Sequence, residues 1–152
     1  MIVLIDTREQ NPLQITAYKT EVICLPVGDY GIQGFSDWSN PAFICERKSL
    51  ADLISSLTSD RPRFWKECLR LRQFTFRALL IEANRQDVEL TQYRSLAHPA
   101  SILASLDALA VRCGLHIFWC CDAEGAARQF EGLVRQFTRG IEKQFNLLDT
   151  KS

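Results

Sequence analysis

The sequence has no long apolar run. Nowhere in its 152 residues do about eighteen apolar residues follow one another, so the chain offers no membrane span. Charges at Asp6, Arg8 and Glu9 interrupt the start of the chain, which excludes the continuous apolar stretch of a signal peptide. We therefore expect a protein that is neither exported nor held in a membrane.

Ligands for zinc are also scarce. There is no CxxC pair, and the only two histidines, His98 and His116, stand at no ligand spacing from a cysteine. The six cysteines lie among apolar residues, in a chain long enough to build a core without disulfides. We expect free thiols in a reducing cytoplasm and no structural zinc.

The chain has no excess of charge of either sign. Its 18 Lys and Arg residues balance 18 Asp and Glu residues, so it is no bulk nucleic-acid coat, although a local basic face remains open. With 47% hydrophobic residues, this length fits one domain over residues 1–152. We expect the last few residues to be disordered.

The order of apolar patterns predicts the fold class. Short β-type runs predict strands, and spacings of three and four predict helices. We expect strands in 2–5, 20–24, 27–33, 42–48, 76–82 and 115–121, and helices in 49–57, 62–74, 99–112 and 127–145. Residues 20–48 read as a meander of antiparallel hairpins. The whole predicts an α/β protein, a mixed β-sheet flanked by α-helices.

The stretch ICERKSL ends one expected strand on three charges. Because side chains two apart share a face, Glu46 and Lys48 project together and Arg47 points away. Asp6 and Asp29 follow neighbouring strands, so they can converge with Glu46. Crowded carboxylates need a cation among them, and ligands that are all oxygen favour Mg²⁺ or Mn²⁺. The alternative is an ordinary ion pair at a strand end.

A hard divalent ion beside a lysine suits one kind of chemistry. Such an ion polarises a phosphoryl group and lowers the pKa of its bound water. The ammonium group of Lys48 can orient that water or offset the charge that develops on phosphorus. The pattern thus predicts metal-assisted hydrolysis of a phosphodiester.

Three motifs carry a family resemblance. DTRE (6–9), GDY (28–30) and ERKSLAD (46–52) resemble, in order and spacing, the nuclease domain of the XPF and Hef group of structure-specific endonucleases. The residues after them resemble stand-alone bacterial and phage members of that group. The resemblance implies a restriction-endonuclease-like fold and a metal-dependent endodeoxyribonuclease. Its DNA would be branched, flapped or forked, and its work repair or recombination in the cytoplasm, beside the nucleoid.

The resemblance also implies roles for individual residues. Asp29, Glu46 and the backbone carbonyl of Arg47 would hold the metal, together with Asp6, and Lys48 would stand at the attacking water. Arg47 would otherwise be structural or contact the phosphate. The implied site residues are Asp6, Arg8, Glu9, Asp29, Glu46, Arg47, Lys48 and Asp52. The alternative is a catalytically silent DNA-binding or scaffold subunit of the same fold.

A basic segment follows these motifs and suggests where DNA lies. A phosphate backbone that enters the metal centre needs neutralising cations. Trp38, in a polar turn, can stack on an unpaired base. The predicted DNA contacts are Arg61, Arg63, Lys66, Arg70 and Trp38. A solvated helix face and a tryptophan packed in its loop are the alternatives.

The last expected helix predicts a protein partner. Its apolar stripe continues to Phe145, further than a small sheet needs for cover, which suggests a homodimer through this helix, with the preceding helix as a further candidate. An intramolecular cap on the sheet is the alternative. The sequence lacks the helix-hairpin-helix motifs usual in the XPF group, so a partner protein could supply specificity for DNA structure.

Overall fold

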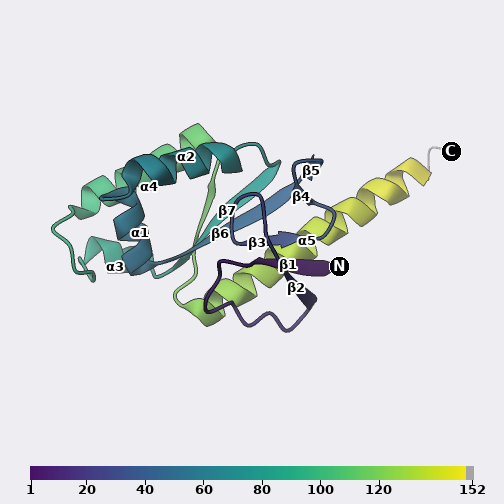
Figure 1. The fold of residues 1–152 in the computed structure, drawn as a ribbon, viewed down its shortest axis with the longest axis horizontal. Coiled ribbons are helices and arrows are strands. Elements are labelled where there is room, and N and C mark those ends of the chain that lie inside the picture. Colours follow the sequence, from purple (N-terminus) through teal and green to yellow (C-terminus); the bar gives the residue numbers. More distant parts are fainter. Residues whose placement is uncertain (150–152) are drawn as a thin grey trace.

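A six-stranded mixed sheet forms the centre of the computed structural model, which describes residues 1–149 (Figure 1). The strand order is β2-β1-β3-β6-β7-β8. These strands are β1 (Ile2–Asp6), β2 (Lys19–Ile23), β3 (Tyr30–Ile32), β6 (Phe43–Ser49), β7 (Phe76–Glu82) and β8 (His116–Trp119). A separate hairpin of β4 (Ser36–Asp37) and β5 (Asn40–Pro41) occupies the predicted turn. The predicted disorder of the last few residues falls outside the described residues.

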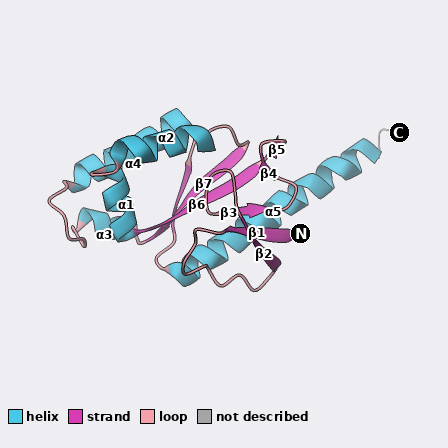
Figure 2. Cartoon of the chain, in the orientation of Figure 1, coloured by secondary structure: helices cyan, strands magenta, loops and turns pink. Residues whose placement is uncertain are grey.

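Helices cover both faces of the sheet. The helices are α1 (Leu50–Leu57), α2 (Arg61–Leu71), α3 (Arg85–Glu89), α4 (Pro99–Cys113) and α5 (Ala123–Asp149). Figure 2 shows α1 to α4 gathered on one side, while α5 crosses the other side and its C-terminal part extends beyond the strands. No helix within residues 1–149 is long and apolar enough to cross a bilayer. The fold is thus the predicted mixed sheet between helical layers.

The two layers explain the continuous apolar run of β7. Leu79 and Ile81 join the core beneath α1, α2 and α4, whereas Ala78 and Leu80 join the core beneath α5. A strand with helices on both faces buries every side chain, so it reads as an unbroken apolar stretch. Seven residues of β6 pair in parallel with β7, which places the end of β6 in the middle of the sheet.

The predicted antiparallel meander over 20–48 is wrong for its first strand. β2 pairs with β1 in parallel, from Ile2 opposite Lys19 to Asp6 opposite Ile23. The long connection over residues 7–18 returns the chain to the start of the sheet, so β2 can run in the same direction as β1. Val22 and Ile23 remain exposed on this edge strand. An apolar pattern identifies a strand but not the direction of its partner.

α1 begins directly after the charged end of β6, as predicted. The Ser49 hydroxyl accepts a hydrogen bond of 3.2 Å from the backbone amide of Asp52, which is the interaction of an N-cap. Leu53, Ile54 and Leu57 turn inward from this start and are buried. The cap fixes where β6 stops and therefore holds the charged residues at a defined place.

Candidate active site

Asp29 is fixed against the charged end of β6 by backbone hydrogen bonds. Its amide donates to the Cys45 carbonyl at 2.9 Å, and the Arg47 amide donates to Asp29 Oδ2 at 2.8 Å. Gly28 makes this approach possible, because its φ is +77° and a Cβ there would lie 2.6 Å from Ile44 Cγ1. The turn before β3 thus places a carboxylate beside Glu46.

Glu46 and Asp29 form a buried acidic pair. Burial is the largest cause that raises the pKa of Asp29 to about 6, although the amide of Arg47 opposes it. Burial, followed by repulsion from Asp29, also raises the pKa of Glu46 well above its usual value. Glu46 is 3% exposed, and its Oε2 has no hydrogen-bond partner. Two such carboxyl groups need either a proton or a cation between them.

Lys48 provides a positive charge beside this pair. As the alternation along β6 predicted, it shares a face with Glu46, and its Nζ lies 3.7 Å from Glu46 Oε1. The ammonium group also lies over the Phe64 ring, 5.1 Å from its centre, so α2 holds the lysine in place. The result is a lysine aimed at the carboxylates from within a packed layer.

Asp6 and Arg8 stand next to the pair but interact with each other. Asp6 is fully buried; its Oδ1 accepts from the Leu25 amide at 2.8 Å, and its Oδ2 accepts from Arg8 Nε at 2.6 Å. Burial raises the pKa of Asp6, but the hydrogen bonds from Arg8 and Leu25 outweigh it and hold the pKa below its usual value. Because both oxygens already accept hydrogen bonds, the structure does not bring Asp6 to Asp29 as a free ligand. Contact of Asp6 with a cation stays a prediction.

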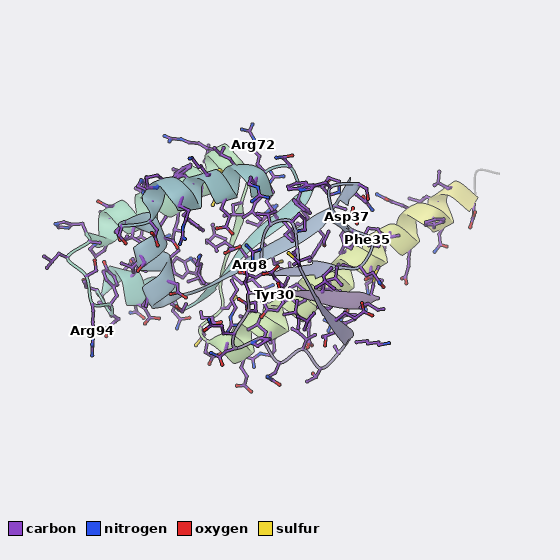
Figure 3. The ribbon with its side chains drawn as sticks, viewed as in Figure 1. Arg8, Tyr30, Phe35, Asp37, Arg72 and Arg94 are labelled. Atoms are coloured by element: carbon purple, nitrogen blue, oxygen red, sulfur yellow. The ribbon has the colours of Figure 1, made fainter. Side chains whose placement is uncertain are left out.

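Arg47 points to the opposite face of the sheet, as the alternation predicted. Its guanidinium group forms ion pairs with Glu9, at 3.0 Å, and with Glu82. The Tyr30 hydroxyl donates to Glu9 Oε2 at 2.6 Å and accepts from the Leu13 amide. Glu9 is thereby held in a network with Arg47, away from Lys48. Figure 3 shows Tyr30 and Arg8 near the middle of the view, where these networks lie.

Two clefts adjoin these networks, one above Asp29, described below, and a polar one on the Arg47 side of the sheet. Asp52, in the exposed first turn of α1, belongs to this cleft. Its lining residues are Arg8, Glu9, Gln10, Asn11, Arg47, Ser49, Asp52 and Glu82. Of the predicted site residues, Arg8 alone lines both clefts. The predicted set is thus divided between two neighbouring surfaces.

The cleft above Asp29 has a volume of about 660 Å³ and is lined mainly by basic side chains. Its lining residues are Arg8, Val27, Asp29, Lys48, Arg63, Lys66, Glu67 and Arg70. Three of the four predicted basic DNA contacts are among them. Arg61 is not, because its guanidinium group donates to Ser105 Oγ at 2.8 Å and lies over the Trp65 ring.

Trp38 lies at the end of this basic surface. Its side chain is 45% exposed, and its ring packs on Phe74 with 5.4 Å between centroids. Arg70 lies 5.9 Å above the same ring. The tryptophan is thus packed in its hairpin, as one alternative predicted, and its stacking on an unpaired base stays a prediction.

Glu67 of α2 is a site residue that sequence reasoning missed. It lines the cleft with Asp29 and Lys48, and its negative charge contributes to the raised pKa of Glu46. A signal was present in the sequence, because Glu67 follows Phe64 by three residues and precedes Cys68, both of which are buried. Helical spacing thus placed this acid next to the apolar arc rather than on the exposed side.

Comparison with known proteins places the chain in a family. The ERCC4 domain matches residues 5–133. XPF from Aeropyrum pernix superposes with a TM-score of 0.71 at 23% identity, over 96% of this chain and 69% of that one. A structure of the same archaeal protein in complex with DNA superposes with a TM-score of 0.66, also at 23% identity, over 91% and 66%.

The present chain therefore spans about two thirds of the length of those archaeal chains. A search of curated proteins finds no match. The similarity to the archaeal structures confirms the predicted restriction-endonuclease-like fold. The family match extends over most of the chain and includes all three motifs singled out from the sequence. This chain belongs to the ERCC4 domain family, the XPF-type nuclease domains.

Proposed function

We propose that this protein is a metal-dependent DNA endonuclease that acts on branched, flapped or forked DNA in repair or recombination. The observation that carries the proposal is the buried carboxyl group of Glu46. Its Oε2 has no hydrogen-bond partner, and Asp29 lies beside it. Lys48 Nζ lies 3.7 Å from Glu46 Oε1, at a cleft lined by basic side chains. Membership of the ERCC4 family supports the same conclusion.

A divalent ion fits this set of donors. Asp29 and Glu46 offer oxygen ligands, which Mg²⁺ and Mn²⁺ prefer, and we assign them, with the backbone carbonyl of Arg47, as the residues that hold it. When bound, such an ion polarises the phosphoryl group and lowers the pKa of its water. Within residues 1–149, no protein group donates a hydrogen bond to Glu46 Oε2.

The chain's own residues supply the rest of the chemistry. Lys48 holds an ammonium group where it can orient the attacking water and offset charge on the phosphate. Arg63, Lys66 and Arg70 neutralise the phosphates of the bound strand. The water oxygen forms a bond to phosphorus as one ester bond breaks, so two DNA ends result. Trp38 offers a ring on which an unpaired base can stack.

We further propose that two copies associate through the distal part of α5. The proximal part is an intramolecular cap, because Ala127, Phe130 and Val134 are buried against the sheet. Further along, Phe145 is 65% exposed and Leu148 is 68% exposed. The intramolecular cap thus accounts for the proximal part of α5, and we propose the homodimer for the exposed distal part. A partner protein that recognises DNA structure, and a place in the cytoplasm beside the nucleoid, complete the proposal.

Cleavage of a labelled flap substrate with Mg²⁺ or Mn²⁺ tests the proposed function. We expect product from the wild type and a decrease of at least about 100-fold for Glu46→Gln, since even groups behind metal ligands contribute about 10–100-fold. Glu89→Gln, an exposed acid on α3, is the matched control and should keep full activity. If wild type and Glu46→Gln give the same background trace, the silent DNA-binding subunit is the better description.

A further inference from the structure

Glu67 is the only acidic residue of α2, yet it does not pair with its basic neighbours. Arg63, one turn earlier, pairs with Asp60 at 3.3 Å, and Arg70 Nη2 donates to the Pro26 carbonyl at 2.7 Å. Within residues 1–149, Glu67 forms no ion pair shorter than 4.0 Å. Its charge is therefore not used to hold α2 together.

The Glu67 carboxylate instead faces the acidic pair. It lines the same cleft as Asp29 and Lys48, and its negative charge raises the pKa of both Asp29 and Glu46. Glu67 of α2 thus adds a third acidic charge beside Asp29, in the turn before β3, and Glu46, on β6. Lys48 is the only cation of the described residues that forms an ion pair with any of the three.

Such an arrangement is unfavourable without further positive charge. Like charges this close repel each other, and burial strengthens the repulsion because the local dielectric is low. The unpartnered Oε2 of Glu46, on a side chain that is 3% exposed, shows that protein donors do not relieve it. A divalent cation would neutralise the excess that one lysine leaves.

We propose that Glu67 is a positioning residue for this cation site: its charge strengthens cation binding by Asp29 and Glu46 and makes DNA binding depend on the cation. Within residues 1–149, no three acidic, histidine or cysteine side chains are already arranged as a ligand set. Glu67 therefore acts through its charge and through Glu46 rather than as a third direct ligand. The inference rests on the proposed function, which places the cation at Asp29 and Glu46.

The position of Glu67 on α2 gives the coupling to DNA. Arg63, Lys66 and Arg70 on the same helix attract phosphates, whereas the uncompensated carboxylates repel them. Once a cation is bound, the repulsion disappears and the attraction remains. Each ligand then increases the affinity for the other by the same factor.

Binding of Mn²⁺ without DNA tests the first half of the inference. The fraction of free Mn²⁺, measured by electron paramagnetic resonance during titration, gives the dissociation constant for wild type, Glu67→Gln, Glu67→Asp and Asp29→Asn. We expect Glu67→Gln to weaken binding by about 10–100-fold and Glu67→Asp, which keeps the charge, to stay within a few-fold of wild type. Glu89→Gln is the matched neutralisation on another helix and should bind like wild type.

The outcomes separate this inference from the proposed function. If Asp29→Asn loses Mn²⁺ binding while Glu67→Gln keeps wild-type affinity, the cation site stands and the role of Glu67 is wrong. If Asp29→Asn keeps wild-type affinity, the cation does not bind at the acidic pair and both proposals fail. Thermal unfolding without metal checks the fold, and Glu67→Gln should unfold no earlier than wild type because one repelling charge is removed.

DNA binding tests the second half. Fluorescence anisotropy of a labelled flap, measured with and without Ca²⁺ as a probe of the same site, gives the factor by which the cation increases DNA affinity. We expect this factor to be several-fold smaller for Glu67→Gln than for wild type, because DNA binds the variant better without the ion. An unchanged factor would contradict the coupling even if Mn²⁺ affinity had fallen.

Discussion

The backbone amide of Arg47 donates a 2.8 Å hydrogen bond to Asp29 Oδ2, so the strand that carries Glu46 also holds its acidic partner. The bond links β6 to the turn before β3, and the pairing of Tyr30 with Cys45 continues the contact between these strands. The hydrogen bond therefore restrains the Asp29 side chain in its position beside the strand that carries Glu46. The repulsion between the two carboxyl groups is built into the sheet, and removing it requires a proton, a cation or a substitution.

The first prediction concerns pH. Since the pKa of Asp29 is raised from 3.8 to about 6 in the folded protein, the folded state holds its proton more tightly than the unfolded state. Stability from this group is present below about pH 4 and is lost as the pH rises through 6. Without metal, we expect the free energy of unfolding to fall by about 2–3 kcal/mol between pH 4 and 7 on this account.

Denaturant unfolding at each pH measures this effect. Other carboxylates titrate in the same range, and Asp6, whose pKa is lowered, contributes in the opposite direction. The quantity to compare is therefore wild type minus Asp29→Asn, which cancels them. Saturating Mn²⁺ should flatten the difference, because the ion replaces the proton. A difference that does not change with pH would contradict the raised pKa.

The second prediction separates Lys48 from cation binding. Lys48→Met should reduce single-turnover cleavage by about 100-fold or more, because the charge beside the attacking water is lost. Mn²⁺ affinity should be retained or increased, since a competing cation 3.7 Å from Glu46 has been removed. Lys19→Met, on the exposed edge strand β2, serves as the control and should cleave normally. A parallel loss of Mn²⁺ binding would show that Lys48 supports the fold of the site instead.

The third prediction concerns the basic surface. Arg63→Glu combined with Arg70→Glu should weaken binding of flap DNA and reduce the slope of affinity against salt concentration, because phosphate contacts are lost. The same charge change at Arg128 and Arg135, exposed on α5, is the control and should leave both quantities close to wild type. If the two double variants lose affinity equally, general charge rather than the cleft attracts DNA.

The fourth prediction uses two glycines with similar backbones. Gly28 and Gly34 have φ of +77° and +84°, so alanine is strained at both, at about 1–3 kcal/mol. At Gly34 a Cβ meets no atom within 4 Å, whereas at Gly28 it comes 2.6 Å from Ile44. We expect Gly28→Ala to lower the unfolding free energy by more than Gly34→Ala, and also to weaken Mn²⁺ binding. Equal destabilisation would mean that Ile44 moves aside without cost.

The fifth prediction concerns the distal part of α5. Phe145→Glu with Leu148→Glu should shift the molar mass measured by light scattering from that of two chains to that of one, because charge replaces exposed apolar surface. Gln144→Glu on the same segment adds charge without removing an apolar side chain and should keep the larger mass. A wild type that is already a single chain at high concentration excludes the proposed homodimer.

Local patterns in the sequence predicted much of the fold. The alternation along β6 correctly placed Glu46 and Lys48 on one face of the sheet and Arg47 on the other, because the side chains of a strand point to only two faces. Ser49 correctly marked the start of α1. The direction of β2 could not be predicted, since its residues are compatible with either neighbour and the path of residues 7–18 decides the pairing.

The site was less predictable than the fold. Asp6 does lie near Asp29, because the backbone amide of Asp6 donates to the Asp29 carbonyl at 2.9 Å. The carboxylate of Asp6, however, accepts hydrogen bonds from Arg8 and Leu25. The orientation of a side chain depends on donors from distant segments, which no local pattern contains. No local pattern identified Glu67 as a site residue, because its acidic neighbours Asp29 and Glu46 lie on a distant turn and strand.

Neighbouring positions on β6 serve opposite layers of the protein, Glu46 towards α2 and Arg47 towards the network of Glu9 and Glu82. A slip of β6 by one residue against β7 would exchange these neighbourhoods and bury an arginine where the carboxylate belongs. Single-residue insertions or deletions in this strand should therefore be tolerated far less than substitutions at exposed positions nearby. The length of β6 is thus constrained in evolution.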